Sequence, residues 1–214
     1  MPATVVCISR TDGADGEAVG IAVASELGYR YVDREVVLRA AEKAHVDRAT
    51  IEDVERRKSF VRRLLDGLTT PTVLAAVEAA PFSVAAADVA AGALDLRDVI
   101  RSVIGDLAEE GRVVIVSHAA SMALAGDSNV LRVLVTASPD VRADRISRGG
   151  KWLAPAEAAA AVRDADRNRQ DYFRRFYDVD REEATYYDVV LNTDQLTAKH
   201  AAAIVCAAAR IAGS

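Results

Sequence analysis

The chain has 214 residues, of which 51% are hydrophobic and 28% charged, and its net charge is −5. This composition is globular and suits one large domain or a core with an inserted subdomain. The acidic balance gives no reason to expect nucleic acid or an anionic membrane surface as a partner. No apolar run is long enough to span a bilayer, and Met1 leads into a predicted strand without a secretory leader. We therefore expect a cytoplasmic protein that does not enter a membrane.

The N-terminal residues predict a strand, a glycine loop and a helix in that order. Thr4–Ile8 is apolar and rich in β-branched residues, which favours a strand buried on both faces. Ala18–Leu27 has the apolar rhythm of a helix and ends at Gly28, a good C-terminal cap. The loop between them contains Gly13 and Gly16. Backbone N–H groups and the positive end of a helix dipole meet in such a loop, and this geometry holds phosphate.

The loop nevertheless lacks the lysine of a Walker A sequence. When Gly16 is aligned with the second glycine of G-x-x-x-x-G-K-S/T, Glu17 stands in the lysine position. Asp12, Asp15 and Glu17 surround the loop with three carboxylates, and Arg10 is its one cation. Two unlike charges about 4 Å apart attract by ~4 kcal/mol at an effective dielectric constant of about 20, and like charges repel equally. The loop alone therefore favours a plain strand-to-helix turn over a phosphate site.

Four further strands are predicted between helical segments, at Tyr29–Val32, Val113–Val116, Val130–Thr136 and Asp188–Asn192. Strands that alternate with helices indicate a parallel sheet covered on both faces. We therefore predict an α/β fold with a five-stranded parallel sheet, in which the strands at 4–8, 113–116 and 130–136 are internal.

The charged triplet Asp33-Arg34-Glu35 follows the second predicted strand. Ligand groups bind at this carboxyl end in open α/β sheets, but acidic residues at a helix N-terminus explain the triplet equally well. Residues 45–112 are predicted to be mostly helical, with a solvated charged face in Asp47–Leu68 and an amphipathic helix at Asp95–Glu110. The alanine-rich segment Val84–Leu94 allows close helix packing, either inside the domain or across a homodimer.

Arginines gather on two helices after the fourth predicted strand. A helix from Asp140 carries Arg142 and Arg145 three residues apart, and so on one face. Gly149-Gly150 separates it from a second arginine-rich helix that contains Arg169. Phosphoryl transfer needs cations on the phosphate oxygens and a lid that excludes water. We expect Arg142, Arg145 and Arg169 to converge on one anion site at the carboxyl edge of the sheet, with Gly149-Gly150 as the hinge region.

Together these motifs resemble the cytidylate kinase-like family of bacterial proteins. The resembling segments are Ile8-Ser9-Arg10 with Gly13–Gly16, Leu27–Glu35, Val114–Ala119, Val133–Arg145, Asp166–Arg169 and Tyr187–Thr193. The resemblance implies a three-layer P-loop fold of the nucleoside monophosphate kinase type, as a single domain over residues 1–214. It also implies a helical acceptor-binding insertion at 34–110 and an arginine-rich lid hairpin at 140–175.

The implied activity is transfer of the ATP γ-phosphoryl group to a nucleoside monophosphate with the help of Mg²⁺, and no side chain is assigned as a metal ligand. The implied phosphate loop is Ser9, Arg10, Gly13, Ala14, Asp15, Gly16 and Glu17. The implied acceptor-binding residues are Asp33, Arg34, His118, Asp166 and Arg169. Arg142, Arg145 and Asp33 are the implied catalytic residues.

Departures from the family pattern predict a poor kinase or none. Asp15 replaces a loop glycine, and Glu17 replaces a basic or neutral residue. Ser117-His118-Ala119 replaces the glycine and arginine associated with the acceptor base. His118 suits either a base-reading residue, a general acid or a local hydrogen-bonding residue. A nucleotide-binding regulatory protein without phosphotransfer, and a homodimer built through Val84–Leu94 without a ligand, are the alternatives.

Overall fold

A computed structural model describes residues 3–33, 100–117, 120–149 and 153–212. The chain divides into two compact units, residues 1–36 with 101–214 and residues 37–100, and all described residues except Ile100 belong to the first. Its elements are β1 (Val5–Arg10), α1 (Gly16–Leu27), β2 (Arg30–Val32), β3 (Val113–Val116), α7 (Ala120–Ala123), β4 (Val130–Thr136), α8 (Pro139–Arg148), α9 (Pro155–Tyr177), a 3₁₀ turn (Ala184–Tyr186), β5 (Val189–Asn192) and α10 (Ala198–Ile211). The helices predicted between 36 and 99, including the alanine-rich segment, lie outside the described residues.

The five strands form one parallel sheet in the order β2-β3-β1-β4-β5. Val5 of β1 is in register with Val113 of β3 and with Val130 of β4, so β1 is central. The predicted parallel sheet, with β1, β3 and β4 internal, is confirmed. β1 continues two residues beyond its predicted end, because Ser9 and Arg10 still pair with β4. Arg10 is therefore held by the sheet through its main chain.

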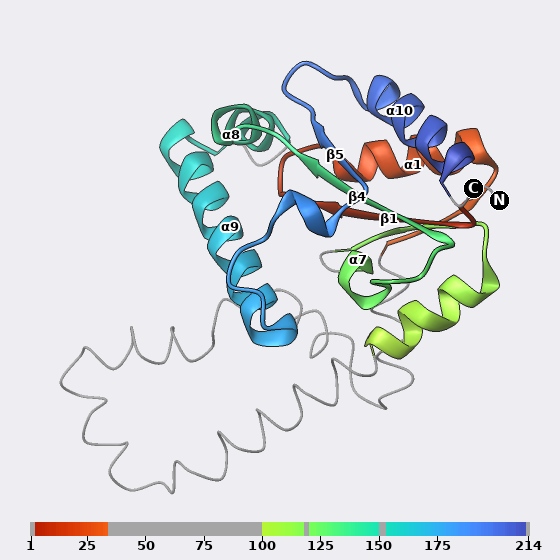
Figure 1. The fold of residues 1–214 in the computed structure, drawn as a ribbon. Helices are drawn as coiled ribbons and strands as arrows, with labels where there is room; N and C mark the ends of the chain where they lie inside the picture. Colours follow the sequence, from red (N-terminus) through yellow and green to blue (C-terminus); the bar gives the residue numbers. More distant parts are fainter. Residues whose placement is uncertain (1–2, 34–99, 118–119, 150–152, 213–214) are drawn as a thin grey trace, which may run out of the picture. The chain divides into compact units, whose positions relative to one another are not determined.

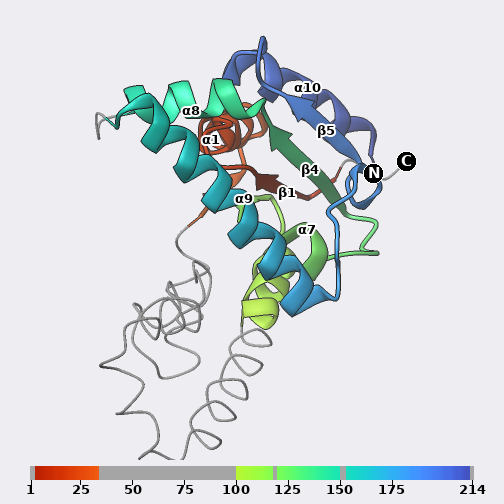
Figure 2. The same cartoon turned by 90° about the vertical axis from the view of Figure 1, so that its left-hand side faces the viewer.

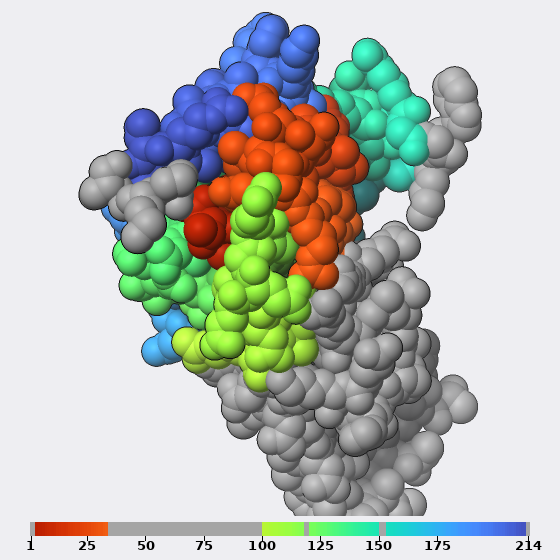
Figure 3. All heavy atoms as spheres, turned by 90° about the vertical axis from the view of Figure 1, so that its right-hand side faces the viewer, coloured from red at the N-terminus to blue at the C-terminus, as the bar shows by residue number. Residues whose placement is uncertain are grey.

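Helices cover both faces of the sheet (Figures 1 and 2). α1 and α10 pack side by side on one face, where Figure 3 shows the orange residues of α1 next to the blue residues of α10. α7 and a helix through residues 100–110 cover the other face. In that second helix Ile100, Val103, Ile104 and Leu107 are buried, as its amphipathic pattern predicts. α8 and α9 pack together as a hairpin and lie at the carboxyl ends of the strands.

The main core lies between the sheet and the α1–α10 layer. It includes Val6 and Ile8 of β1, Val19 and Val23 of α1, and Val205 of α10. Burial of such side chains stabilises the fold by roughly 1.5–3 kcal/mol each relative to exposure. Glycine at position 20 lets α1 approach the sheet, since a Cβ there would lie 2.5 Å from Val116 Cγ2.

The two cysteines, Cys7 and Cys206, are free thiols buried in the core. Burial raises the pKa of the Cys7 thiol well above its ordinary value, and nearby Asp127 adds to the effect. Burial likewise raises the pKa of Cys206 to about 11. Among the described residues, no helix is both long and apolar enough to cross a bilayer.

An ion pair fixes the entry of the edge strand β5. The side chain of Asp188 accepts hydrogen bonds from Arg132 N at 2.8 Å, Nε at 3.1 Å and Nη2 at 2.6 Å. Partial burial works to raise the pKa of Asp188, but the hydrogen bonds and charge of Arg132 outweigh it and lower that pKa. This pair anchors the start of β5, the strand after which Thr193 reaches the carboxyl edge of the sheet.

Candidate functional site

The loop between β1 and α1 turns sharply at two residues. Gly13 has φ +81°, which L side chains rarely adopt. Asp15 has φ 59° and immediately precedes α1. The helix begins at Gly16, two residues before its predicted start at Ala18. Aspartate is one of the few residues other than glycine that occupies this left-handed region at modest cost. A glycine would occupy it without that cost.

An arginine of the same chain occupies the space beside each loop glycine, where a side chain would otherwise lie. A Cβ at Gly13 would lie 2.8 Å from the carbonyl oxygen of Arg142 and 3.0 Å from its Cβ. A Cβ at Gly16 would lie 2.5 Å from Cβ of Arg10 and 2.8 Å from its Cδ. Glycine is therefore required at these positions by packing against α8 and against the side chain of Arg10.

Arg10 lies between two loop carboxylates. Its Nη1 is 3.0 Å from Asp12 Oδ1, and its Nη2 is 2.5 Å from Glu17 Oε1. The sequence placed these charges together in the loop but did not show which pairs they form. We refer to Arg10, Asp12 and Glu17 as the Arg10 cluster.

The three predicted lid arginines all reach the same loop. Arg142 Nη1 donates to the carbonyl of Asp12 at 3.4 Å. Arg145 Nη1 donates to the carbonyl of Gly13 at 3.3 Å. Arg169 Nη1 donates to the carbonyl of Arg10 at 3.0 Å. The arginines thus surround the turn from two helices, while their convergence on a bound anion stays a prediction. α8 ends at Arg148 and Gly149 follows it; Gly150, the other residue of the predicted hinge, lies outside the described residues.

Each lid arginine is also paired with a carboxylate of the chain. Arg142 forms a bidentate pair with Asp166, at 2.8 and 2.6 Å. Arg145 Nε is 3.3 Å from Asp15 Oδ2. Arg142 is only 3% exposed, and its Nε is a buried nitrogen without a hydrogen-bond partner in the described structure. An unpaired buried N–H carries a desolvation cost of ~1–3 kcal/mol.

Thr193, the residue after β5, connects the lid to the loop. Arg145 donates from Nη1 to Thr193 Oγ1 at 3.0 Å and from Nη2 to the Thr193 carbonyl at 2.5 Å. The Thr193 hydroxyl is 3.0 Å from the carbonyl of Ala14. In the sequence, Thr193 stands out only as the last residue of the motif Tyr187–Thr193. Its position beyond a predicted parallel strand was the signal that could have marked it as a site residue.

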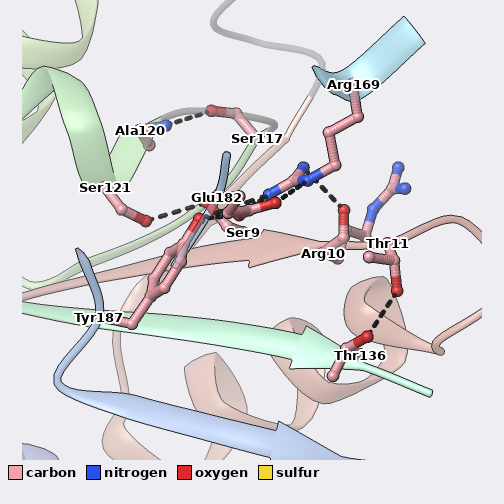
Figure 4. Close-up of polar contacts among 10 residues, drawn as sticks. All are labelled: Ser9, Arg10, Thr11, Ser117, Ala120, Ser121, Thr136, Arg169, Glu182 and Tyr187. Carbon is pink, nitrogen blue, oxygen red and sulfur yellow. Dashed lines mark hydrogen bonds and ion pairs between the residues drawn. The ribbon is translucent and has the colours of Figure 1, made fainter. Parts of the chain in front are cut away.

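A buried polar network lies beside the loop, under α9 (Figure 4). Arg169 pairs with Glu182, from Nε to Oε2 at 2.7 Å and from Nη2 to Oε1 at 2.6 Å. The Tyr187 hydroxyl donates to the same Oε1. Burial raises the pKa of Tyr187 well above its ordinary value; the charge of Arg169 opposes this shift and that of Glu182 supports it. The hydroxyls of Ser9 and Ser121 lie 3.0 Å apart in the same region. No sequence motif had marked Glu182.

The predicted acceptor residues are assembled only in part. Asp33 follows β2, near Tyr31, where burial first and then the carboxylates of Asp33 and Glu17 raise the pKa of Tyr31 to about 12. Asp166 and Arg169 are present on α9, each already in an ion pair. Arg34 and His118 lie outside the described residues.

The charges of the site nearly cancel. Four arginines are paired there with five carboxylates: Arg10 with Asp12 and Glu17, Arg142 with Asp166, Arg145 with Asp15, and Arg169 with Glu182. Nowhere in the described parts of the chain do three or more His, Cys, Asp or Glu side chains gather to hold a metal ion. The helix N-terminus and the arginine donors suit a phosphate chemically, but the space above Gly16 is taken by Arg10.

The sequence matches the model of the cytidylate kinase-like family over residues 5–195. The chain belongs to the cytidylate kinase-like family. No curated protein matches it. An uncharacterized protein from Eubacterium ventriosum is similar in structure, with a TM-score of 0.63, 14% identity and 94% of each chain covered. A shikimate kinase from Bacteroides thetaiotaomicron has a TM-score of 0.51 and 14% identity, over 94% of this chain and 96% of the other.

A shikimate kinase from Acinetobacter baumannii in complex with shikimate has a TM-score of 0.50 and 13% identity, over 96% of this chain and 90% of the other. At these identities the solved structures establish the fold alone, which is the predicted P-loop kinase fold. In this cytidylate kinase-like protein Asp15 immediately precedes α1, and Glu17 pairs with Arg10.

Packing at Gly13 gives a direct test of how closely α8 contacts the loop. Gly13→Ala is expected to lower the free energy of unfolding by ~2–4 kcal/mol, through left-handed strain and overpacking against the main chain of Arg142. Gly126→Ala is the matched control, because Gly126 has φ +91° with no atom within 4 Å of the added Cβ. Gly126→Ala should lower the free energy of unfolding by only ~1–2 kcal/mol. Urea unfolding measures both variants, and equal losses would contradict tight packing of α8 on the loop.

Proposed function

We propose that this protein binds a nucleoside triphosphate at loop 9–17 and transfers its γ-phosphoryl group slowly to a nucleoside monophosphate. One observation carries the proposal: Arg142, Arg145 and Arg169 each donate a hydrogen bond to a carbonyl of the loop. Cations from two helices thus surround the turn where α1 begins, which is the arrangement that phosphoryl transfer requires. Membership of the cytidylate kinase-like family supports the same reaction.

The roles of the residues follow from their positions. Main-chain N–H groups of Gly13–Gly16 and the N-terminus of α1 would hold the donor phosphates, next to Ser9 and Arg10. Arg142 and Arg145 would neutralise charge on the transferred group, and Asp33 would orient the acceptor hydroxyl. Arg34, His118, Asp166 and Arg169 are proposed for acceptor binding. Mg²⁺, when bound with ATP, supplies further neutralisation of phosphate charge. No covalent intermediate is needed, since the residues act by positioning and electrostatics.

A second function, nucleotide binding without phosphotransfer, is favoured by a different observation. All four arginines around the loop are paired with the chain's own carboxylates. A protein in which these pairs persist would hold a nucleotide as a regulatory ligand without stabilising the transition state. The ligand-free homodimer requires the segment Val84–Leu94, which the structure does not describe.

Binding is tested by thermal unfolding with ATP, ADP, CMP or AMP, with and without Mg²⁺. A nucleotide at about 100 times its dissociation constant should stabilise the protein by ~2.7 kcal/mol. For a chain of this size, that stabilisation raises the midpoint temperature of unfolding by ~5–10 °C. The unphosphorylated nucleosides serve as control ligands.

Arg145→Gln should remove most of the nucleotide-induced rise in the midpoint temperature of unfolding, whereas Arg148→Gln should preserve it. Arg148 is on the same helix, but its side chain is 79% exposed and pairs with Asp144. No shift with any nucleotide, or equal losses in the two variants, would overturn the proposal.

A further inference from the structure

The main chain of Arg10 is held on two sides. Arg10 is the last residue of β1 and is in register with Val135 of β4. Its carbonyl accepts a hydrogen bond from Arg169 Nη1 at 3.0 Å. Any rearrangement at this position is therefore confined to the side chain.

That side chain lies across the first residue of α1. Its Cβ and Cδ occupy the space that a Cβ of Gly16 would need. The first N–H groups of a helix have no partners within the helix and attract anions. Glu17 is in this first turn, and its carboxylate holds the Arg10 guanidinium at 2.5 Å. In the Arg10 cluster, a carboxylate thus sits where a phosphate would be attracted.

Among the described contacts, the Arg10 guanidinium is held only by two monodentate carboxylates. Its two partners, Asp12 and Glu17, have side chains that are 46% and 45% exposed. Arg142 and Arg169 are held instead by bidentate pairs and are almost completely buried. Arg145 is held twice by Thr193 in addition to Asp15. Monodentate pairs with half-exposed carboxylates are weaker than buried bidentate pairs, so a phosphate of higher charge can replace them.

We propose that Arg10 is the cation that contacts phosphate in this loop, and that Glu17 and Asp12 compete with the phosphate for it. This inference rests on the proposed nucleotide site and names the residue that replaces the absent Walker lysine. On binding, the guanidinium exchanges carboxylate oxygens for phosphate oxygens, and its planar donors suit a bidentate contact. Affinity is then set by a competition inside the loop.

The test is a double-mutant cycle on the full chain, with inorganic pyrophosphate as the probe and calorimetry as the readout. Glu17→Gln should lower the dissociation constant by ~10-fold, because the competing charge is gone. Arg10→Gln should raise it by ~10–100-fold. When the two changes are combined, Glu17→Gln should improve affinity by less than about 3-fold, because the pair it relieves no longer exists.

Glu26→Gln removes the same charge near the other end of α1, where Glu26 pairs with Arg210, and should leave the dissociation constant unchanged. If Arg10→Gln does not fold, Arg10→Met, which keeps the stem of the side chain without its charge, replaces it in the cycle. Arg10→Lys keeps the positive charge and is a separate control. In the Arg10→Lys background the gain from Glu17→Gln should remain, because the ammonium also pairs with Glu17.

Equal gains from Glu17→Gln with and without Arg10 would mean simple charge repulsion and would overturn the inference. Normal pyrophosphate binding by Arg10→Gln would also overturn it. In either case the proposed function would stand, since the loop still binds phosphate. If neither the unmodified protein nor Glu17→Gln binds pyrophosphate or ATP, both the inference and the proposed function fail.

Discussion

Turnover of a nucleoside monophosphate by the unmodified protein should fall well below the ~1–100 s⁻¹ usual for kinases. The double variant Asp15→Gly, Glu17→Lys should raise that turnover by ~10²-fold. Loss of one well-placed electrostatic contact typically costs ~10²–10³ in rate, and the lysine position of this loop holds an acid. The variant restores the missing cation and removes two negative charges from the phosphate loop.

The ion pairs of the loop explain why both positions matter. Asp15 holds Arg145 through Nε, so glycine there releases this nitrogen and relieves the left-handed strain at φ 59°. Glu17 holds Arg10, so lysine there releases it and supplies a second point charge. A lysine in the first turn of α1 opposes the helix dipole by ~0.3–1 kcal/mol. When phosphate is bound, the attraction between the added charge and the anion outweighs this cost.

Release of ADP with CMP or AMP as acceptor measures the effect. Glu26→Lys, the same charge change near the C-terminal end of α1, should leave the rate unchanged. An unmodified protein that turns over at the ordinary rate would contradict the prediction and would indicate that Arg10 supplies the full electrostatic contribution of a Walker lysine to phosphoryl transfer. Nucleotide binding with no turnover in either protein would favour the binding-only function.

The sheet could be predicted because its signals are local. β-branched runs such as Val113–Val116 are buried on both faces only inside a parallel sheet, and the helices between them imply the parallel connections. The end of β1 was predicted two residues early, since Ser9 and Arg10 end the apolar run. Pairing with β4 extends the strand, because backbone hydrogen bonds do not depend on side-chain polarity.

The site could be predicted only as a set of charges. The lid arginines were found from their spacing, but spacing gives no partner for a guanidinium. Arg145 is held by Thr193 from 48 residues away. Arg169 is held by Glu182, which belongs to the irregular segment between α9 and β5. Such pairs form only when separate elements of the fold pack together, and no local sequence pattern encodes which elements come into contact.

Arg169 therefore has a structural role that the family resemblance did not suggest. It was expected on the acceptor nucleotide, yet it joins α9 to Glu182, to Tyr187 and to the carbonyl of Arg10. Its guanidinium carbon also lies 4.9 Å from the ring centre of Phe173. Because it holds the main chain where the loop begins, a change at its partner should affect both stability and the phosphate site.

Glu182→Ala should lower the free energy of unfolding by ~3–5 kcal/mol. Side-chain exposure is 7% for Arg169 and 19% for Glu182, so the substitution leaves a buried charge without its carboxylate. The Tyr187 hydroxyl loses its acceptor at the same time. Glu183→Ala is the control: Glu183 is the exposed neighbour, with only a 3.4 Å contact to Thr185, and should change stability by less than ~0.5 kcal/mol.

The cause of the loss can be separated by adding Arg169→Leu to Glu182→Ala and repeating the urea unfolding. If the buried charge dominates, the double variant should be more stable than Glu182→Ala alone, because no unpaired guanidinium remains. A Glu182→Ala protein as stable as the Glu183→Ala control would show that water reaches Arg169 and replaces the carboxylate. Arg169 would then be available to an acceptor nucleotide, as the family resemblance implies.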